Sequence, residues 1–268
     1  MKKDDLEDIS KQWLNFKEVN ESLSPLTIEK YAGYMVSLQE FLGEKTLLNA
    51  DADDLIKFTG LHCHKKGLSP SSRKAVVSAI NGFYKWAFEN EHITNNPAKK
   101  VVSPKIGRKM PIAMGLKNAE KLLMQPDISS FLGLRDAAMI SLLIGCGMRI
   151  GGLCALNQGD LLWYEHNGVG RLAIKLVEKG KNERIVPVPN EAMLLVKAYL
   201  GHPALGDMDL DLPDGDRVLF VSTQNRMVPE YDYRGEARRL RKRRVQTVIT
   251  EYAEAAGIPM NQAHPHAL

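Results

Sequence analysis

Residues 135–161, RDAAMISLLIGCGMRIGGLCALNQGDL, form the stretch that decides the second half of the fold. From Arg135 to Gly145 the segment is almost continuously apolar, which predicts a buried helix. The glycine-rich sequence after it carries one arginine, Arg149. We therefore predict a helix core that ends close to a single positively charged side chain.

The sequence after this stretch predicts a small sheet and further helices. Leu172–Val177 and Arg184–Val188 are short runs rich in β-branched residues, and the polar sequence EKGKNE separates them. This pattern is typical of a β-hairpin with a glycine-containing loop. Asn190–Leu200 and Arg234–Ala256 are predicted to be helices. The second half is therefore expected to be α+β.

The first hundred residues predict a unit made only of helices. Ser24-Pro25 and Ser69-Pro70 each combine an N-cap serine with a proline at the first helical position. Asp53–Lys66 reads as another helix, which Gly67 ends. Apolar residues follow the two serine-proline pairs at helical spacing, most clearly Val76, Val77, Ile80, Phe83, Tyr84, Ala87 and Phe88. We predict a helical domain at residues 1–102, a basic linker at 103–113 and a second domain at 114–268.

Composition places the chain among ordinary globular proteins. Of its 268 residues, 44% are hydrophobic and 25% are charged. No segment approaches the roughly 18 apolar residues that span a bilayer, and the start shows no signal peptide, so we expect a cytoplasmic protein without a membrane partner. The three cysteines include no CxxC pair and are expected to be reduced.

Positive charge is concentrated in two segments, although the net charge is only +4. Thr94–Met110 contains five cations and no acid, and Arg234–Arg244 contains seven cations and one glutamate. Such clusters favour contact with phosphates. Each cluster taken alone is equally typical of a solvated helix face or a charged linker.

Four pieces of the sequence, the first of them made of two segments, together resemble the tyrosine recombinases, also called phage integrases. SPLTIEKYAGYMVSLQEFL (24–42) and GLSPSSRKAVVSAINGFYKWAFENEHITNNPA (67–98) are similar to the core-binding domain of that family. The stretch quoted first resembles its first arginine motif, EKGKNERIVPVP (178–189) its lysine hairpin, and HPHAL (264–268) the opening of its His-x-x-Arg box. The resemblance implies a mainly α fold with a small β-sheet: an N-terminal helical, SAM-like domain and an α+β catalytic domain.

The resemblance also implies a catalytic set. Attack on a DNA phosphodiester places negative charge on the nonbridging oxygens, which fixed cations stabilise. Arg149 matches the arginine with that role, Lys179 the general acid of the hairpin loop, and His266 the histidine that assists proton transfer. Lys181 and His264 are the alternatives if the register slips. No metal and no cofactor are implied.

The sequence departs from the family pattern in two places. The family usually has Arg-x-x-Glu-Leu at the first arginine, and here Gly152 replaces the glutamate. The second arginine and the nucleophilic tyrosine of the family follow the histidine box, and nothing follows Leu268. We therefore expect this chain to bind DNA without cutting it. The alternatives are a non-catalytic decoy or regulator that occupies recombination sites, and a helical scaffold with incidental basic patches.

Double-stranded DNA is the partner that the resemblance implies, held between the two domains. The family acts as a tetramer on two DNA sites, and we expect the chain as given to be a monomer away from DNA. The helix that begins at Ser69 is the candidate for the major groove. The residues predicted to contact DNA are Ser71, Ser72, Arg73, Lys74, Lys99, Lys100, Lys105, Arg108, Lys109, Arg238, Arg239 and Arg241.

Overall fold

The structure, a computed structural model, describes residues 6–107, 112–177 and 183–264. The chain forms two compact units, Met1–Lys109 and Met110–Leu268. The boundary between the units falls inside the predicted linker, and the described linker residues 103–107 belong to no helix or strand. Each unit has its own apolar core.

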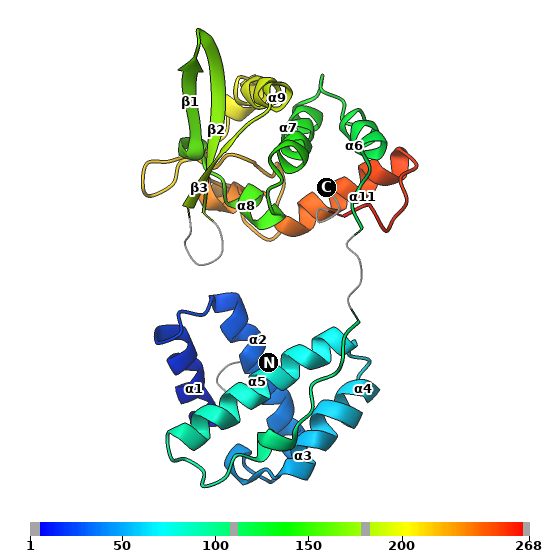
Figure 1. Ribbon diagram of the computed structural model, residues 1–268. Helices are drawn as coiled ribbons and strands as arrows, with labels where there is room; N and C mark the ends of the chain where they lie inside the picture. Colours follow the sequence, from blue (N-terminus) through cyan, green and yellow to red (C-terminus); the bar gives the residue numbers. More distant parts are fainter. Residues whose placement is uncertain (1–5, 108–111, 178–182, 265–268) are drawn as a thin grey trace. The chain divides into compact units, whose positions relative to one another are not determined.

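The N-terminal unit consists of helices joined by short turns, as the sequence predicts (Figure 1). The serine-proline starts of α2 and α5 are both present, and the Ser69 hydroxyl accepts a hydrogen bond from the Ser72 amide. The predicted helix at Asp53–Lys66 is α3, a π-helical turn and α4 in succession, and Gly67 follows with φ of +74°. The elements are α1 (Asp8–Val19), α2 (Pro25–Leu42), η2 (Leu47–Asn49), α3 (Ala52–Lys57), η3 (Phe58–His62), α4 (Cys63–Lys65), α5 (Pro70–Glu89) and η4 (Pro97–Lys100).

Large aromatic side chains fill the core of the N-terminal unit. Trp13 of α1 stacks on Tyr31 of α2 and meets Phe83 of α5 edge to face, with centroid distances of 5.5 and 5.6 Å. Tyr84 is fully buried, and its hydroxyl donates to the Leu47 carbonyl at 2.7 Å. These contacts bury the apolar stripe of α5. They stabilise the unit, because burial of apolar surface is the main force that holds short helices together.

The C-terminal unit is α+β, with helices around one small sheet. In Figure 1 the three strands lie side by side, with α9 next to β2 and α7 beside α9. The elements are α6 (Leu116–Leu123), α7 (Phe131–Cys146), α8 (Ile150–Ala155), η5 (Gln158–Asp160), β1 (Leu161–His166), β2 (Val169–Val177), β3 (Glu183–Pro187), α9 (Asn190–Leu200), α10 (Pro203–Gly206), η6 (Glu230–Asp232), η7 (Gly235–Arg238) and α11 (Lys242–Ala255).

The sheet is antiparallel, in the order β1-β2-β3. The predicted hairpin is β2 and β3, paired from Ala173–Pro187 to Val177–Glu183. The sequence reading missed β1, and its burial pattern explains why. Only Leu161 of its six residues is buried, so the strand lacks the regular alternation that marks a half-buried strand.

The predicted helix at Arg234–Ala256 is wrong in its first eight residues. Helix α11 begins only at Lys242. The segment before it pairs with residues 220–222 instead: the Ser222 amide donates to the Arg238 carbonyl at 2.7 Å and the Leu240 amide to the Phe220 carbonyl at 2.9 Å. Gly235 also takes a positive φ of +48°, which ends any helical path there. Backbone pairing with a distant segment therefore overrides the local helical pattern.

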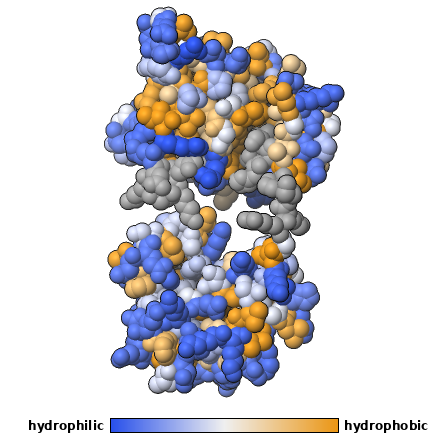
Figure 2. Space-filling model, in the orientation of Figure 1, coloured by the Kyte–Doolittle hydropathy of each residue, from blue (hydrophilic) through white to orange (hydrophobic). Residues whose placement is uncertain are grey.

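Hydropathy gives no sign of a membrane segment in the described part of the chain. Within residues 6–107, 112–177 and 183–264, none of the helices combines the length and the apolar character that crossing a bilayer needs. The visible surface of each unit mixes hydrophilic and apolar side chains (Figure 2).

Candidate functional site

Arg149 lies in the turn between α7 and α8. The buried α7 ends at Cys146, and Gly147 follows with φ of +57°, the left-handed conformation in which glycine commonly ends a helix. Arg149 is the N-cap of α8, and its carbonyl accepts from the Leu153 amide at 3.0 Å. The residue is exposed, while Leu153 below it is fully buried. The core therefore fixes the backbone at Arg149 and leaves its side chain at the surface.

Lys179 and His266, the other two predicted catalytic residues, lie outside the described residues. The described hairpin closes at the pair Val177–Glu183, on either side of the loop sequence that contains Lys179. A Cβ on Gly152 would lie 3.9 Å from Leu176, so the end of β2 packs close to α8. The last described segment, which precedes His266, is held to α11 by a hydrogen bond from the Thr250 hydroxyl to the Ala263 carbonyl at 3.4 Å.

Arg239, predicted to bind DNA, has its guanidinium engaged within the protein. Its Nε donates to both carboxylate oxygens of Glu236, at 2.8 and 2.7 Å. Its Nη1 donates to the Cys154 and Leu156 carbonyls at 3.2 and 3.0 Å, and its Nη2 to Asn157 Oδ1 at 2.7 Å. The side chain therefore fastens the end of α8 to the segment before α11.

Arg238 is also half-buried. Its guanidinium carbon lies 4.4 Å from the centre of the Tyr233 ring, a cation–π arrangement. The Tyr233 hydroxyl in turn donates to the Ser222 carbonyl at 2.6 Å. Arg238 thus contributes to the packing of the loop before α11.

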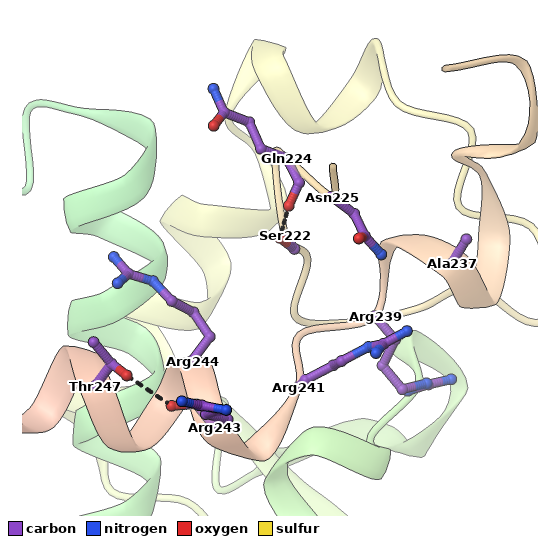
Figure 3. A pocket seen from close by; sticks show the side chains of 9 residues that line it. All are labelled: Ser222, Gln224, Asn225, Ala237, Arg239, Arg241, Arg243, Arg244 and Thr247. Atoms are coloured by element: carbon purple, nitrogen blue, oxygen red, sulfur yellow. Dashed lines mark hydrogen bonds between the residues drawn. The ribbon is translucent and has the colours of Figure 1, made fainter. Parts of the chain in front are cut away.

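Arg241, Arg243 and Arg244 differ from these two residues because all three are exposed. They line a pocket at the start of α11 together with polar side chains (Figure 3). Arg244 is 3.3 Å from the exposed carboxylate of Glu251, a type of pair that contributes little to stability. The pocket is lined by Ser222, Gln224, Asn225, Ala237, Arg239, Arg241, Arg243, Arg244 and Thr247.

The predicted DNA-contact residues of the N-terminal unit lie at its surface. Ser71, Ser72 and Lys74 are exposed in the first turns of α5, and Arg73 is half-buried. The Ser69 hydroxyl lies 2.9 and 3.0 Å from those of Ser71 and Ser72.

The cations that follow α5 are also at the surface where they are described. Lys99 is exposed, and its ammonium lies 5.4 Å from the centre of the Phe88 ring. Lys100 and Lys105 are exposed as well, whereas Arg108 and Lys109 lie outside the described residues.

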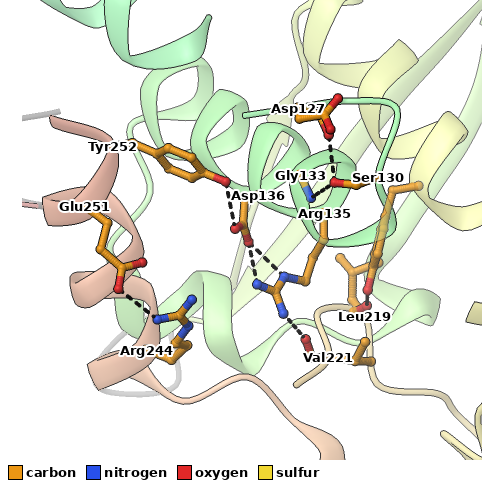
Figure 4. Close-up of polar contacts among 11 residues, drawn as sticks. Asp127, Ser130, Gly133, Arg135, Asp136, Leu219, Val221, Arg244, Glu251 and Tyr252 are labelled. Atoms are coloured by element: carbon orange, nitrogen blue, oxygen red, sulfur yellow. Dashed lines mark hydrogen bonds and ion pairs between the residues drawn. The ribbon is translucent and has the colours of Figure 1, made fainter. Parts of the chain in front are cut away.

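A buried polar network that the sequence reading missed lies at the start of α7 (Figure 4). Arg135 and Asp136 are each 3% exposed. Arg135 donates to Asp136 Oδ1 through Nε at 2.8 Å and Nη2 at 2.6 Å, and through Nη1 to the Val221 carbonyl at 2.8 Å. The Tyr252 hydroxyl donates to Asp136 Oδ2 at 3.3 Å, and burial together with the Asp136 charge raises the pKa of Tyr252 to about 12.

This network links α7, α11 and the segment that carries Ser222. One sequence signal could have found it, since two adjacent opposite charges at the start of an apolar helix must pair if that helix is buried. The Arg135–Asp136 pair has a structural role, because its charged atoms are buried and make their hydrogen bonds inside the core.

Comparisons with known proteins agree with this architecture. The profile of the phage integrase family matches residues 114–268, and that of the phage integrase N-terminal SAM-like domain matches residues 10–91. The chain belongs to the phage integrase family. It has the fold of a Xer-like tyrosine recombinase: a SAM-like helical domain and a catalytic domain with a small antiparallel sheet.

Several relatives are Xer recombinases. The chain is 31% identical to tyrosine recombinase XerC of Myxococcus xanthus over 185 residues, and 30% identical to tyrosine recombinase XerD of Listeria monocytogenes over 199 residues. These alignments cover 66% and 73% of this chain, but only 57% and 65% of the relatives. The match therefore spans less than two thirds of either relative.

Solved structures support the fold. The XerH site-specific recombinase bound to a palindromic difH substrate superposes with a TM-score of 0.68, at 20% identity over 96% of this chain and 70% of XerH. A lambda integrase tetramer bound to a Holliday junction gives a TM-score of 0.59, at 15% identity over 92% of this chain and 64% of lambda integrase.

Proposed function

We propose that this chain is part of a site-specific tyrosine recombinase, which breaks and rejoins DNA by transesterification at a backbone phosphodiester. The observation that carries the proposal is the family match over residues 114–268 together with an exposed Arg149 in the turn between the buried α7 and α8. The guanidinium of an arginine is planar, and its donors fit the oxygens of a phosphate. Arg149 therefore presents a group suited to a DNA phosphate at the surface of the unit.

The chemistry assigns a role to each residue of the catalytic set. Arg149 stabilises the negative charge that develops on the nonbridging oxygens of the five-coordinate phosphorus. Lys179 protonates the departing 5′ oxygen, and His266 assists proton transfer at the same phosphate. The nucleophile is a tyrosine hydroxyl, which forms a 3′-phosphotyrosine bond as the 5′ oxygen leaves. The reverse attack by a 5′ hydroxyl rejoins the strand, so no external energy source is needed.

Both units are proposed to contact duplex DNA. In the C-terminal unit the exposed Arg241, Arg243 and Arg244 suit phosphate contacts, whereas the donors of Arg239 are largely used inside the protein. In the N-terminal unit the start of α5, with Ser71, Ser72, Arg73 and Lys74, is the proposed major-groove element. Phosphate contacts would set affinity, and base-edge contacts would set the choice of site.

The proposed assembly is a homotetramer on two DNA sites, as lambda integrase is a tetramer on a Holliday junction in its solved structure. For a polypeptide of residues 1–268 alone we propose a monomer that binds duplex without cleaving it. In the family's order the second arginine and the tyrosine follow the histidine box, and all eight tyrosines of these 268 residues precede His266.

A cleavage experiment with the complete gene product tests the proposal. Binding-site selection first identifies a preferred duplex. That duplex is then nicked near the cleavage position, so that cleavage releases a short fragment that carries the 5′ hydroxyl and diffuses away. The protein should stay bound to the remaining DNA as a covalent 3′-phosphotyrosine adduct. Residues 1–268 alone should bind the same duplex and give no adduct. A complete protein that binds the selected site and forms no adduct would favour the decoy or regulator instead, and absence of any duplex binding would remove both.

A further inference from the structure

The first turn of α8 is in contact with a lysine from the start of α11. A Cβ built on Gly151 would lie 3.2 Å from the Lys242 ammonium nitrogen and 3.3 Å from its Cε. The far end of the Lys242 side chain therefore rests on the backbone of Gly151, two residues after Arg149. Only a residue without a side chain leaves this space open.

Other observations agree on the position of the lysine. Lys242 and Cys154 of α8 line the same hollow. Burial raises the pKa of the Cys154 thiol to about 11, and the positive charges of Lys242 and Arg239 oppose that rise. The ammonium thus lies along α8 rather than pointing away from it.

Lys242 has no structural task comparable with that of Arg239. It is exposed, and among the described residues no carboxylate lies within ion-pair distance of it. By contrast, Arg239 makes hydrogen bonds to three different residues of the segment 154–157. A cation that lies against Gly151, two residues after Arg149, without an ion pair among the described residues is suited to a ligand's negative charge.

The family pattern gives this arrangement a meaning. In Arg-x-x-Glu-Leu an acidic side chain follows the arginine by three residues, whereas this chain has two glycines, Gly151 and Gly152. We infer that Gly151 and Lys242 act as a matched pair, in which the glycine makes room for the lysine to bind a DNA backbone phosphate beside the one held by Arg149. This inference rests on the proposed function and adds a phosphate-binding residue to it.

The salt dependence of duplex binding is the direct test. Each phosphate that a protein neutralises on B-DNA contributes roughly 0.9 to the slope of log affinity against log salt. The dissociation constant of residues 1–268 for a random-sequence duplex is measured over a salt series, for the wild type and for Lys242→Gln. We expect Lys242→Gln to weaken binding and to reduce the slope by about 1, and Lys242→Arg to keep the wild-type slope.

Gly151→Ala probes the same contact without removing a charge. Its methyl group would displace the end of the lysine, which is flexible, and alanine also favours the helix, so the melting temperature should hold or rise. We expect a lower affinity and a smaller slope nonetheless. In the Lys242→Gln background the alanine should have no further effect, because the displaced group is already gone. Lys197→Gln, on the exposed side of α9, is the matched charge control and should change neither quantity by as much.

The outcomes separate the two proposals. An unchanged slope in Lys242→Gln, with normal salt-dependent binding by the wild type, would overturn the matched pair and leave the recombinase proposal standing. Equal slope losses in Lys242→Gln and Lys197→Gln would also overturn it, because the effect would then be one of net charge. A wild-type chain that binds duplex without salt dependence would remove both proposals.

Discussion

Arg135 and Arg149 stand near opposite ends of α7 and meet opposite environments. Arg135 is 3% exposed and donates to Asp136 and the Val221 carbonyl, whereas Arg149 is exposed in a turn fixed by Gly147. The same guanidinium group is a structural cross-link in one place and a candidate phosphate ligand in the other. Positive charge in a sequence therefore indicates a function only after the buried partners are known.

Asp136→Ala should have the largest effect on stability. It leaves the Arg135 guanidinium buried without its carboxylate, and breaking a buried pair in this way costs about 3–5 kcal/mol. Urea unfolding of the C-terminal unit should show the loss. Asp207→Ala, in an exposed loop, is the control and should change the free energy of unfolding by less than about 0.5 kcal/mol. Similar stabilities for the two variants would contradict the structural role of the pair.

Arg149→Ala should have the converse effect on the complete gene product, which we propose to be a recombinase: activity falls and stability is kept. Loss of one preorganised donor should slow covalent adduct formation by about 10²–10³-fold. The melting temperature should stay near that of the wild type, because the side chain is exposed. Single-turnover cleavage on the nicked duplex measures the rate, with Arg226→Ala as an exposed control. A rate of adduct formation within a few-fold of the wild-type rate would contradict the role of Arg149 in transition-state stabilisation.

Arg239→Met and Arg241→Met sharpen the same contrast within one segment. Removal of Arg239 leaves the Cys154 and Leu156 carbonyls without these donors and should lower the free energy of unfolding by about 1–3 kcal/mol. Removal of the exposed Arg241 should leave stability within about 0.5 kcal/mol and weaken duplex binding instead. Thermal unfolding and duplex titration of both variants test the pair, and a reversed result would exchange their roles.

The smallest expected effect is that of Cys154 on the free energy of unfolding, and this effect depends on pH. The folded thiol has a pKa of about 11 because it is buried, against 9.0 for a cysteine thiol in water. Between these values the folded chain keeps a proton that the unfolded chain releases, so the free energy of unfolding falls as pH rises. Cys154→Ala should lack this fall, on the order of 1 kcal/mol, in denaturation curves from pH 8 to about 11. If the free energies of unfolding of the wild type and Cys154→Ala differ by a constant amount over that pH range, the raised pKa of Cys154 is contradicted.

Much of the fold could be predicted because its signals are local. The serine-proline pairs mark the starts of α2 and α5, and the apolar run after Arg135 marks α7. The hairpin of β2 and β3 also follows from residues close in sequence. β1 could not be predicted, because one buried residue among six gives no periodic pattern.

The candidate site was only partly predictable. The motif order pointed to Arg149, Lys179 and His266, and the structure describes only Arg149 of the three. The arginine-rich segment was read as one helix, yet Arg238 and Arg239 lie outside α11. The contact between Gly151 and Lys242 joins residues about ninety positions apart, and no local pattern encodes it.

The sequence by itself determined α2, α5, α7 and α9, the hairpin and the family, since each rests on residue types at short, fixed spacing. Only the tertiary structure decided which cationic side chains donate their hydrogen bonds inside the protein and which remain at its surface. The physical reason is that a buried guanidinium must find carbonyl or carboxylate partners wherever the fold supplies them. For Arg239 those partners lie more than eighty residues earlier in the chain.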